Sequence, residues 1–258
     1  MTSIIFTDTI GVSEDYAPKP ASKVIPEWYK NTESYITGDK KPTGNGMTTG
    51  TIKRCMPVFD VLISGYVLVT HTDLFISHKK LEYGDQEHLE KTGETRILSE
   101  EEIKAKKLPL TEHWFEWPSY DPIAFHPPKQ ALLHPIATGN SVPKWINPWG
   151  IKTPPGYSTL FIPPVHRSNS LVALPGVVDT DTYNVPVNIV FSIFDPNFEG
   201  LIPAGTPIVQ VIPFKRDSWE MSLGKAEDVI AQENIVKKLR TRFFDSYKVQ
   251  HRQPKEYR

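Results

Sequence analysis

The stretch of sequence that decides the fold runs from residue 153 to residue 216. It begins with TPPGY at residues 153–157, continues through GVVDTDTY at 176–183 and closes with LIPAGTPIVQVIP at 201–213. Turns rich in glycine and proline alternate there with short runs of valine, isoleucine and leucine, a pattern typical of strands joined by tight turns. The stretch therefore predicts a β-rich core. Its expected strands are 158–162, 171–178, 187–194 and 208–214.

Proline is the anomaly in the composition of the whole chain. It accounts for 24 of the 258 residues, about twice the usual share of roughly 5%. Because proline interrupts long helices and is tolerated at strand ends and in turns, this abundance favours short strands joined by rigid connections. The predicted fold class is mainly β.

Charge and hydropathy exclude several classes of partner. The chain has 29 basic and 30 acidic residues, for a net charge of -1, so no overall field attracts nucleic acid or an anionic membrane. No apolar run approaches the roughly 20 residues that span a bilayer, and the N-terminus lacks the pattern of a signal peptide. We expect a soluble protein of the cytoplasm, with no membrane partner and no strong nucleic-acid signal.

We expect one β-rich domain over residues 1–224, followed by a C-terminal helix and polar tail over residues 225–258. Within the domain, residues 1–20 are predicted to form an arm that lies on another surface. The strongly charged residues 79–110 indicate an exposed insertion, in which the Ser99-x-x-Glu102 spacing predicts the start of a helix.

Other local patterns predict individual elements. The apolar runs 58–63 and 66–70 flank Ser64-Gly65 and predict two buried strands or one long bent strand. Pro26 predicts a short helix over residues 25–30. Apolar residues at helical spacing predict an amphipathic helix from residue 226 to residue 247. These apolar residues are Val229, Val236, Leu239, Phe243 and Tyr247.

The aromatic clusters, the single cysteine and the histidines give three further predictions. The aromatic clusters at 113–120 and 145–149 are expected to be core or interface anchors, and base-stacking platforms are the alternative. The single cysteine, Cys55, excludes an intrachain disulfide and is predicted to be a buried, inert thiol. The eight histidines lack the spacing that places two ligands on one strand or helix, so no metal site is predicted.

The strongest candidate for chemistry is the pair Asp179 and Asp181. In an extended strand both side chains would project to one face, together with Tyr183. Two carboxylates and an aromatic ring could hold a magnesium-bound phosphate, with one carboxylate activating water. The alternative is a strand end in which Asp179 accepts hydrogen bonds in a turn, Asp181 is solvated and Tyr183 packs on the core.

The order of these motifs resembles the β-clip core of the trimeric dUTPase and dCTP deaminase superfamily. The resemblance covers residues 150–216 and implies a β-clip-like barrel or sandwich of short strands. It also implies that Asp179 activates the attacking water, Tyr183 packs against the deoxyribose and Arg167-Ser168 contacts phosphate. Gln210 matches a strand of the trimer core and joins the candidate substrate-binding residues.

The chain departs from this family at several positions. Val67 stands where the family has the aspartate that holds magnesium through water, and Thr182 separates Asp181 from the tyrosine, which in a strand moves the ring to the other face. The glycine-rich C-terminal motif of the family is missing, and a charged helix takes its place. The resemblance therefore supports the fold more strongly than the hydrolysis.

The sequence and the resemblance together suggest two candidate functions of different classes. The first is a degenerate dUTPase-like β-clip protein, without that activity, which self-associates, as the family's trimers do, and acts as a structural or interaction component. The whole chain is also similar to uncharacterised proteins of tailed phages and their bacterial hosts, which implies a phage-type source and a location in the host cytoplasm or the virion. The alternative is a nucleotide-binding or nucleotide-modifying enzyme that uses Asp179 with Arg167 and Tyr183. No cofactor is expected for the first function, and magnesium is expected for the second.

Overall fold

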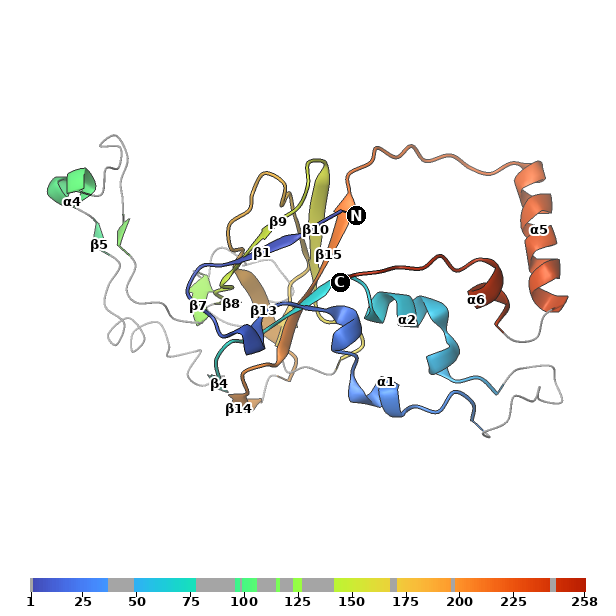
Figure 1. The fold of residues 1–258 in the computed structure, drawn as a ribbon, viewed down its shortest axis with the longest axis horizontal. Coiled ribbons are helices and arrows are strands. Elements are labelled where there is room, and N and C mark those ends of the chain that lie inside the picture. Colours follow the sequence, from blue (N-terminus) through green and yellow to red (C-terminus); the bar gives the residue numbers. More distant parts are fainter. Residues whose placement is uncertain are drawn as a thin grey trace.

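The computed structural model of the chain shows a mainly β protein (Figure 1). It describes residues 2–36, 49–77, 96–97, 99–105, 115–116, 123–126, 142–167, 171–195, 198–241 and 245–258. Every pairing between its named strands is antiparallel. The predicted fold class is therefore confirmed at the level of a mainly β fold.

A five-stranded sheet forms the centre of the molecule, in the order β12-β10-β15-β3-β2. Its strands are β2 (Lys19–Pro20), β3 (Tyr66–Val69), β10 (Tyr157–Ile162), β12 (Gly176–Val178) and β15 (Pro207–Lys215). The longest strand, β15, lies in the middle and pairs with β10 on one side and β3 on the other. Its valine and isoleucine residues suit this largely buried position, because branched side chains pack well on a pleated surface.

A four-stranded sheet in the order β11-β13-β8-β7 lies beside the first. Its strands are β7 (Ile123–His126), β8 (Val142–Trp145), β11 (Leu171–Ala173) and β13 (Ile189–Ile193). Three two-stranded sheets complete the described strands. They are β1 (Ile5–Asp8) with β9 (Trp149–Lys152), β4 (Leu74–Ser77) with β14 (Glu199–Ile202), and β5 (Arg96–Ile97) with β6 (Phe115–Glu116). Among the described strands, none of these sheets closes into a barrel.

The hydrophobic core lies between the two larger sheets. Phe161 and Val211 are directly paired across β10 and β15, and both point into it together with Trp145 and Phe191. The aromatic cluster at 145–149 is therefore confirmed as a core anchor, while most of the cluster at 113–120 lies outside the described residues. On the opposite face of the sheet, residues 16–24 cover Val67 and Val69 of β3.

The N-terminal arm predicted at residues 1–20 is part of these sheets. Its strand β1 pairs with β9, and its strand β2 pairs with β3 at the edge of the central sheet. The surface on which it lies belongs to the same chain.

The predicted strand at 58–63 is wrong, because this segment is the helix α2 (Met56–Leu62). Pro57 occupies the first turn, where its missing N–H is harmless. The backbone N–H of Ile63 donates to the carbonyl of Phe59 at 3.1 Å, which continues the helical pattern. Gly65 then reverses the chain with φ of 69°, and only the second run, in β3, is a strand.

The C-terminal helix is shorter than predicted. Helix α5 (Ala226–Thr241) is followed by the separate helix α6 (Ser246–Gln250), and Asp245 before α6 has a φ of 60°. The left-handed backbone at Asp245 is incompatible with one continuous helix to residue 247. None of the described helices is long and apolar enough to cross a bilayer.

Two other predicted helices are confirmed. Helix α1 (Glu27–Asn31) begins directly after Pro26, and helix α4 (Glu100–Ala105) begins directly after Ser99. The rest of the predicted insertion at 79–110, apart from 96–97, lies outside the described residues. Cys55, which was expected to be buried, is half-buried just before α2.

The backbone of Gly65 lies very close to the backbone of β15. A Cβ at Gly65 would lie 2.0 Å from the carbonyl oxygen of Val211 in β15. We expect Gly65→Ala to lower the free energy of unfolding by more than about 2 kcal/mol, because the strand backbone cannot move aside without losing its pairing. Urea denaturation measures this change.

Gly11→Ala is the matched control. Gly11 has a similar φ of 80°, but a Cβ there would meet nothing within 4 Å. It should therefore cost only the backbone strain of about 1 kcal/mol. Equal losses in the two variants would show that the approach of Gly65 to β15 contributes nothing.

Candidate functional site

The two aspartates lie just beyond the end of β12, in a turn. The backbone carbonyl of Asp179 accepts hydrogen bonds from the N–H groups of Thr182 at 3.1 Å and Tyr183 at 2.8 Å. The strand itself ends at Val178. The expectation that both aspartates and the tyrosine share one face of an extended strand is therefore wrong, because the turn rotates each residue out of the pleated arrangement.

A buried threonine network holds this turn in place. The Thr180 hydroxyl is 2.7 Å from that of Thr153 and 2.8 Å from that of Thr159, and Thr180 is almost completely buried. The N–H of Thr153 also donates to the carbonyl of Thr180 at 3.2 Å. Each buried hydroxyl thus has a partner, which avoids the cost of an unsatisfied polar group. The network joins the turn to β10 and to the TPPGY segment.

Asp181 is occupied by a bidentate ion pair with Arg216, which follows β15. Nη1 of Arg216 donates to one carboxylate oxygen at 2.9 Å, and Nη2 donates to the other. The second oxygen also accepts the N–H of Gly156 at 2.8 Å. The hydrogen bonds from Arg216 lower the pKa of Asp181 from 3.8 to about 2. A carboxylate this weakly basic is a poor general base, and the expectation that Asp181 is solvated is wrong, since its side chain is only 6% exposed.

Asp179 is the more available of the two acids. Its Oδ1 accepts the Ser158 hydroxyl at 2.6 Å and Nη1 of Arg216 at 3.2 Å. Its side chain is 62% exposed, and Oδ2 has no hydrogen-bond partner among the described residues. Ser158, Asp179, Asp181 and Arg216 therefore form a cluster, here called the acid–arginine cluster, with one carboxylate oxygen open to solvent.

The remaining predicted residues lie elsewhere. Tyr183 is 55% exposed, so it does not pack on the core. Arg167 lies past the Ile162 end of β10, whereas the acid–arginine cluster lies at the Ser158 end, roughly 13 Å away along the strand. Its Nη2 donates to the carbonyl of Val24, and burial lowers its pKa. Ser168 lies outside the described residues.

Gln210 joins three segments of the backbone in the interior. Its Nε2 donates to the carbonyls of Val61 at 3.0 Å and Ser64 at 2.6 Å, and its Oε1 accepts the N–H of Val165 at 3.2 Å. The residue is fully buried. It therefore attaches the end of α2 and the loop after β10 to β15, and it presents no atom to a ligand.

A second cluster, which sequence reasoning missed, holds the C-terminal residues 245–258 on the rest of the molecule. Asp60 of α2 is buried and accepts from Nε of Arg252 at 2.9 Å and Nζ of Lys255 at 3.0 Å. Burial raises the pKa of Asp60, but these two hydrogen bonds outweigh it and the pKa is lowered. Tyr66 stacks edge-to-face with Tyr257. The predicted polar tail is therefore docked.

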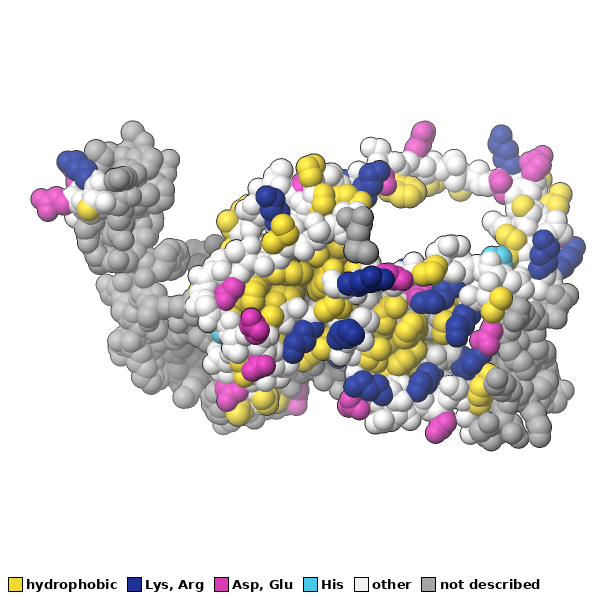
Figure 2. All heavy atoms as spheres, in the orientation of Figure 1, with side chains coloured by type: hydrophobic (Ala, Val, Ile, Leu, Met, Phe, Trp, Pro, Cys, Tyr) yellow, Lys and Arg dark blue, Asp and Glu magenta, His cyan; other side chains and the backbone are white. Residues whose placement is uncertain are grey.

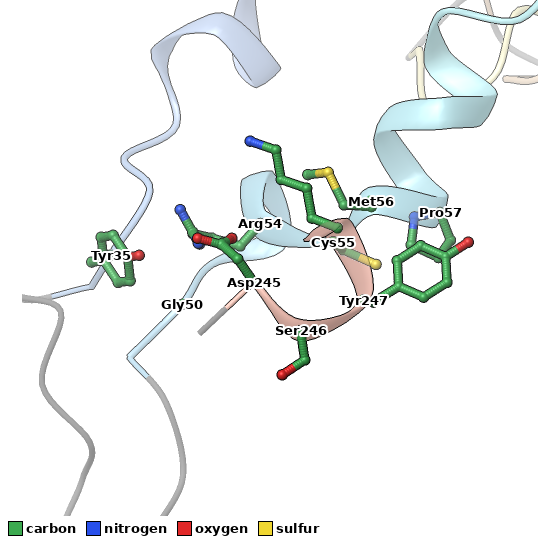
Figure 3. Close-up of a pocket in the computed structure, with 10 residues that line it drawn as sticks. Tyr35, Gly50, Arg54, Cys55, Met56, Pro57, Asp245, Ser246 and Tyr247 are labelled. Carbon is green, nitrogen blue, oxygen red and sulfur yellow. The ribbon is translucent and has the colours of Figure 1, made fainter. Parts of the chain in front are cut away.

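A pocket of about 390 Å³ lies where this tail meets the segment before α2. Figure 3 shows the Arg54 and Asp245 side chains pointing toward each other across it, and they form an ion pair. The Arg54 guanidinium also lies 4.8 Å from the centre of the Tyr35 ring. The pocket joins residues nearly two hundred positions apart, and no local pattern in the sequence indicates that they meet. Arg216 was missed for the same reason, although it directly follows the recognised strand β15.

The described residues contain no group of three or more histidine, cysteine, aspartate or glutamate side chains that could hold a metal ion. Asp179 and Asp181 are instead bridged by a guanidinium, which supplies the positive charge beside them. The arrangement can stabilise the fold, and its single open oxygen on Asp179 can accept one further hydrogen bond.

The ion pair of Asp181 makes the stability of the protein depend on pH. Because its folded pKa of about 2 is below its ordinary value of 3.8, the stabilisation is complete above pH 4 and disappears as the pH falls toward 2. We expect Asp181→Asn to lower the melting temperature at pH 7 and to flatten its decline between pH 4 and pH 2. Glu220→Gln, at an exposed position, is the control and should follow the wild type. An unchanged pH profile in Asp181→Asn would contradict this role.

Comparisons with known proteins do not assign the chain to a family. No family model matches the chain, and no curated protein sequence matches it at a significant level. The roles given to Asp179, Asp181 and Arg216 rest on the contacts described above.

Proposed function

We propose that this chain is a self-associating structural or interaction protein with a β-clip-like core. The observation that carries the proposal is the exposure of one continuous segment, since every residue from Phe214 to Lys238 is exposed. We call residues 217–241 the C-terminal arm. In Figure 1 it leaves the end of β15 and runs to α5 at the edge of the molecule.

The first part of the arm has the pattern of a strand without a partner. Trp219, Met221 and Leu223 are 90%, 85% and 86% exposed. They alternate with Ser218, Glu220 and Ser222, so in extended backbone the three apolar side chains share one face. Burying each such side chain contributes about 1.5 to 3 kcal/mol, which favours association with a surface outside this single chain.

The central sheet also has an uncovered apolar face near β12. Leu160 of β10 is directly opposite Val177 on one side and Ile212 on the other, so the three side chains form a row. Val177 is 58% exposed, and Phe214 farther along β15 is 39% exposed. This row lies on the face opposite to the core, beyond the part that residues 16–24 cover. It is a second apolar surface that association would bury.

The acid–arginine cluster supports a structural interpretation of the GVVDTDTY motif. Arg216 connects both aspartates to the start of the C-terminal arm. Gly156 contributes a backbone N–H to the carboxylate of Asp181. The cluster thus fixes where the arm leaves the sheet. The order of the motifs around it supports the β-clip-like core, and the similarity to phage proteins supports a role in such an assembly.

The self-association is tested by the mass of the protein in solution. We expect light scattering after size exclusion to give a multiple of the 29.3 kDa chain mass. Replacing Trp219, Met221 and Leu223 by serine should shift the population toward smaller species, because it removes the apolar face of the arm. Ser218→Ala with Ser222→Ala, on the alternate face, is the matched control and should leave the mass unchanged. A wild-type monomer at all concentrations would refute the proposal.

The alternative, a nucleotide-handling enzyme, has one favourable observation, the open carboxylate oxygen of Asp179. Within one chain, Arg167 does not reach this oxygen, and Arg216 already pairs with both aspartates. We expect deoxynucleotides with magnesium to leave the melting temperature unchanged, whereas a ligand at 100 times its dissociation constant adds about 2.7 kcal/mol. A shift that disappears in Asp179→Asn would favour the enzyme instead.

A further inference from the structure

Two pockets lie at opposite ends of helix α2. The pocket of about 390 Å³ is lined by Met56 and Pro57, in the first turn of α2. A second pocket, of about 520 Å³, is lined by Ile63, which directly follows the helix. Because α2 has 7 residues, the two pockets are separated by about 10 Å along its axis.

The C-terminal tail, residues 245–258, runs from one pocket to the other. Tyr247 lines the first pocket and Tyr257 lines the second. Between them, Arg252 lies over the Phe59 ring of α2, 5.5 Å from its centre. Figure 1 shows the tail running beside α2 toward the C-terminus. The tail therefore lies along α2 and contributes side chains to both pockets.

Basic side chains outnumber acidic ones along α2 and the tail. Figure 2 shows lysine and arginine side chains gathered on this face around an apolar patch. The first pocket has two cations and one acid, and the second has three cations and one acid: Arg54, Lys248 and Asp245 in the first, and Lys23, Lys255, Arg258 and Glu256 in the second. Each of these acids pairs with the arginine of its own pocket.

Several positive charges on this face are not neutralised. The buried Asp60 is shared by two cations, Arg252 and Lys255. Lys23 and Lys248 are exposed, and neither has an acidic partner among the described residues. The net charge of -1 for the whole chain does not reveal this surface, because the fold brings its cations together from separate segments. Such a surface fits an anionic partner with several charges.

Each pocket also combines its cations with an aromatic ring. Tyr247 in the first pocket is 44% exposed, and Tyr257 in the second is half-buried. Proteins bind single-stranded nucleic acid through cations that follow the phosphates and aromatic rings that stack on the bases. The bases of a duplex are stacked inside it and cannot enter a pocket without leaving the helix. The two pockets therefore suit unpaired nucleotides.

We propose that a single strand of DNA or RNA binds along α2 and the C-terminal tail. Its phosphates pair with the exposed cations, chiefly Lys23 and Lys248, and its bases enter the pockets beside Tyr247 and Tyr257. A few nucleotides span the distance between the pockets, whereas a mononucleotide reaches only one pocket and binds more weakly. This surface is separate from the C-terminal arm, so binding does not require the proposed self-association.

The test measures the fluorescence anisotropy of labelled oligothymidine and oligouridine with the full-length protein at increasing salt. We expect both to bind less tightly as salt rises, because each phosphate contact releases counterions. The tighter of the two identifies DNA or RNA as the ligand. Lys23→Gln with Lys248→Gln should weaken binding and reduce the slope of the logarithmic salt dependence by about 0.7 for each lost contact. Tyr247→Leu should weaken binding about fivefold or more and keep the slope, because it removes only base stacking.

The control, Lys152→Gln with Lys225→Gln, removes the same charge from exposed positions outside this face and should bind like the wild type. Thermal melting checks that each variant is folded. The absence of binding at low salt would overturn the proposal. Equal losses in the two double variants would also overturn it, since they would indicate attraction to any surface cation. A duplex of the same length that binds as tightly as the single strand would contradict the entry of bases into the pockets.

Discussion

The central position of β15 is the constraint on which the rest of the structure depends. Hydrogen bonds to β10 and β3 on its two sides place the TPPGY segment and α2 relative to each other. From its interior, Gln210 holds the end of α2, and from its end, Arg216 holds the turn after β12. A strand paired on both edges cannot shift by one residue without reversing all of its side chains, so these contacts are formed together.

The acid–arginine cluster illustrates how the same residue types can serve fold or chemistry. When two carboxylates lie close together, the pKa of one of them is raised or a cation binds between them. Here a guanidinium sits between them, and one carboxylate is almost fully buried against it while a backbone N–H completes its hydrogen bonds. The guanidinium that could bind a phosphate is therefore already paired with both carboxylates, and of the two aspartates only Asp179 keeps an open oxygen.

The C-terminal arm has the opposite character. Arg216, which directly precedes it, is held by two ion pairs, but residues 217–238 are exposed and several of them are apolar. Because apolar area in water costs free energy in proportion to its size, such a segment is consistent with a chain that is completed by other chains. The proposed association surface therefore lies in the C-terminal arm, outside the stretch 153–216.

The sequence alone predicted β10, β13 and β15, because runs of branched residues between glycine and proline turns specify extended structure locally. The single strand predicted at 171–178 is wrong, because the segment divides into β11 and β12, which lie in different sheets, and β14 was not predicted. The sequence also predicted α1 and the existence of a C-terminal helix. The run at 58–63 was misassigned because a short apolar segment fits a strand or a helix equally well. Only the tertiary structure brought Arg216 to Asp181, Asp60 to Arg252 and Arg54 to Asp245. Such pairs depend on the packing of segments distant in sequence, which no local pattern specifies.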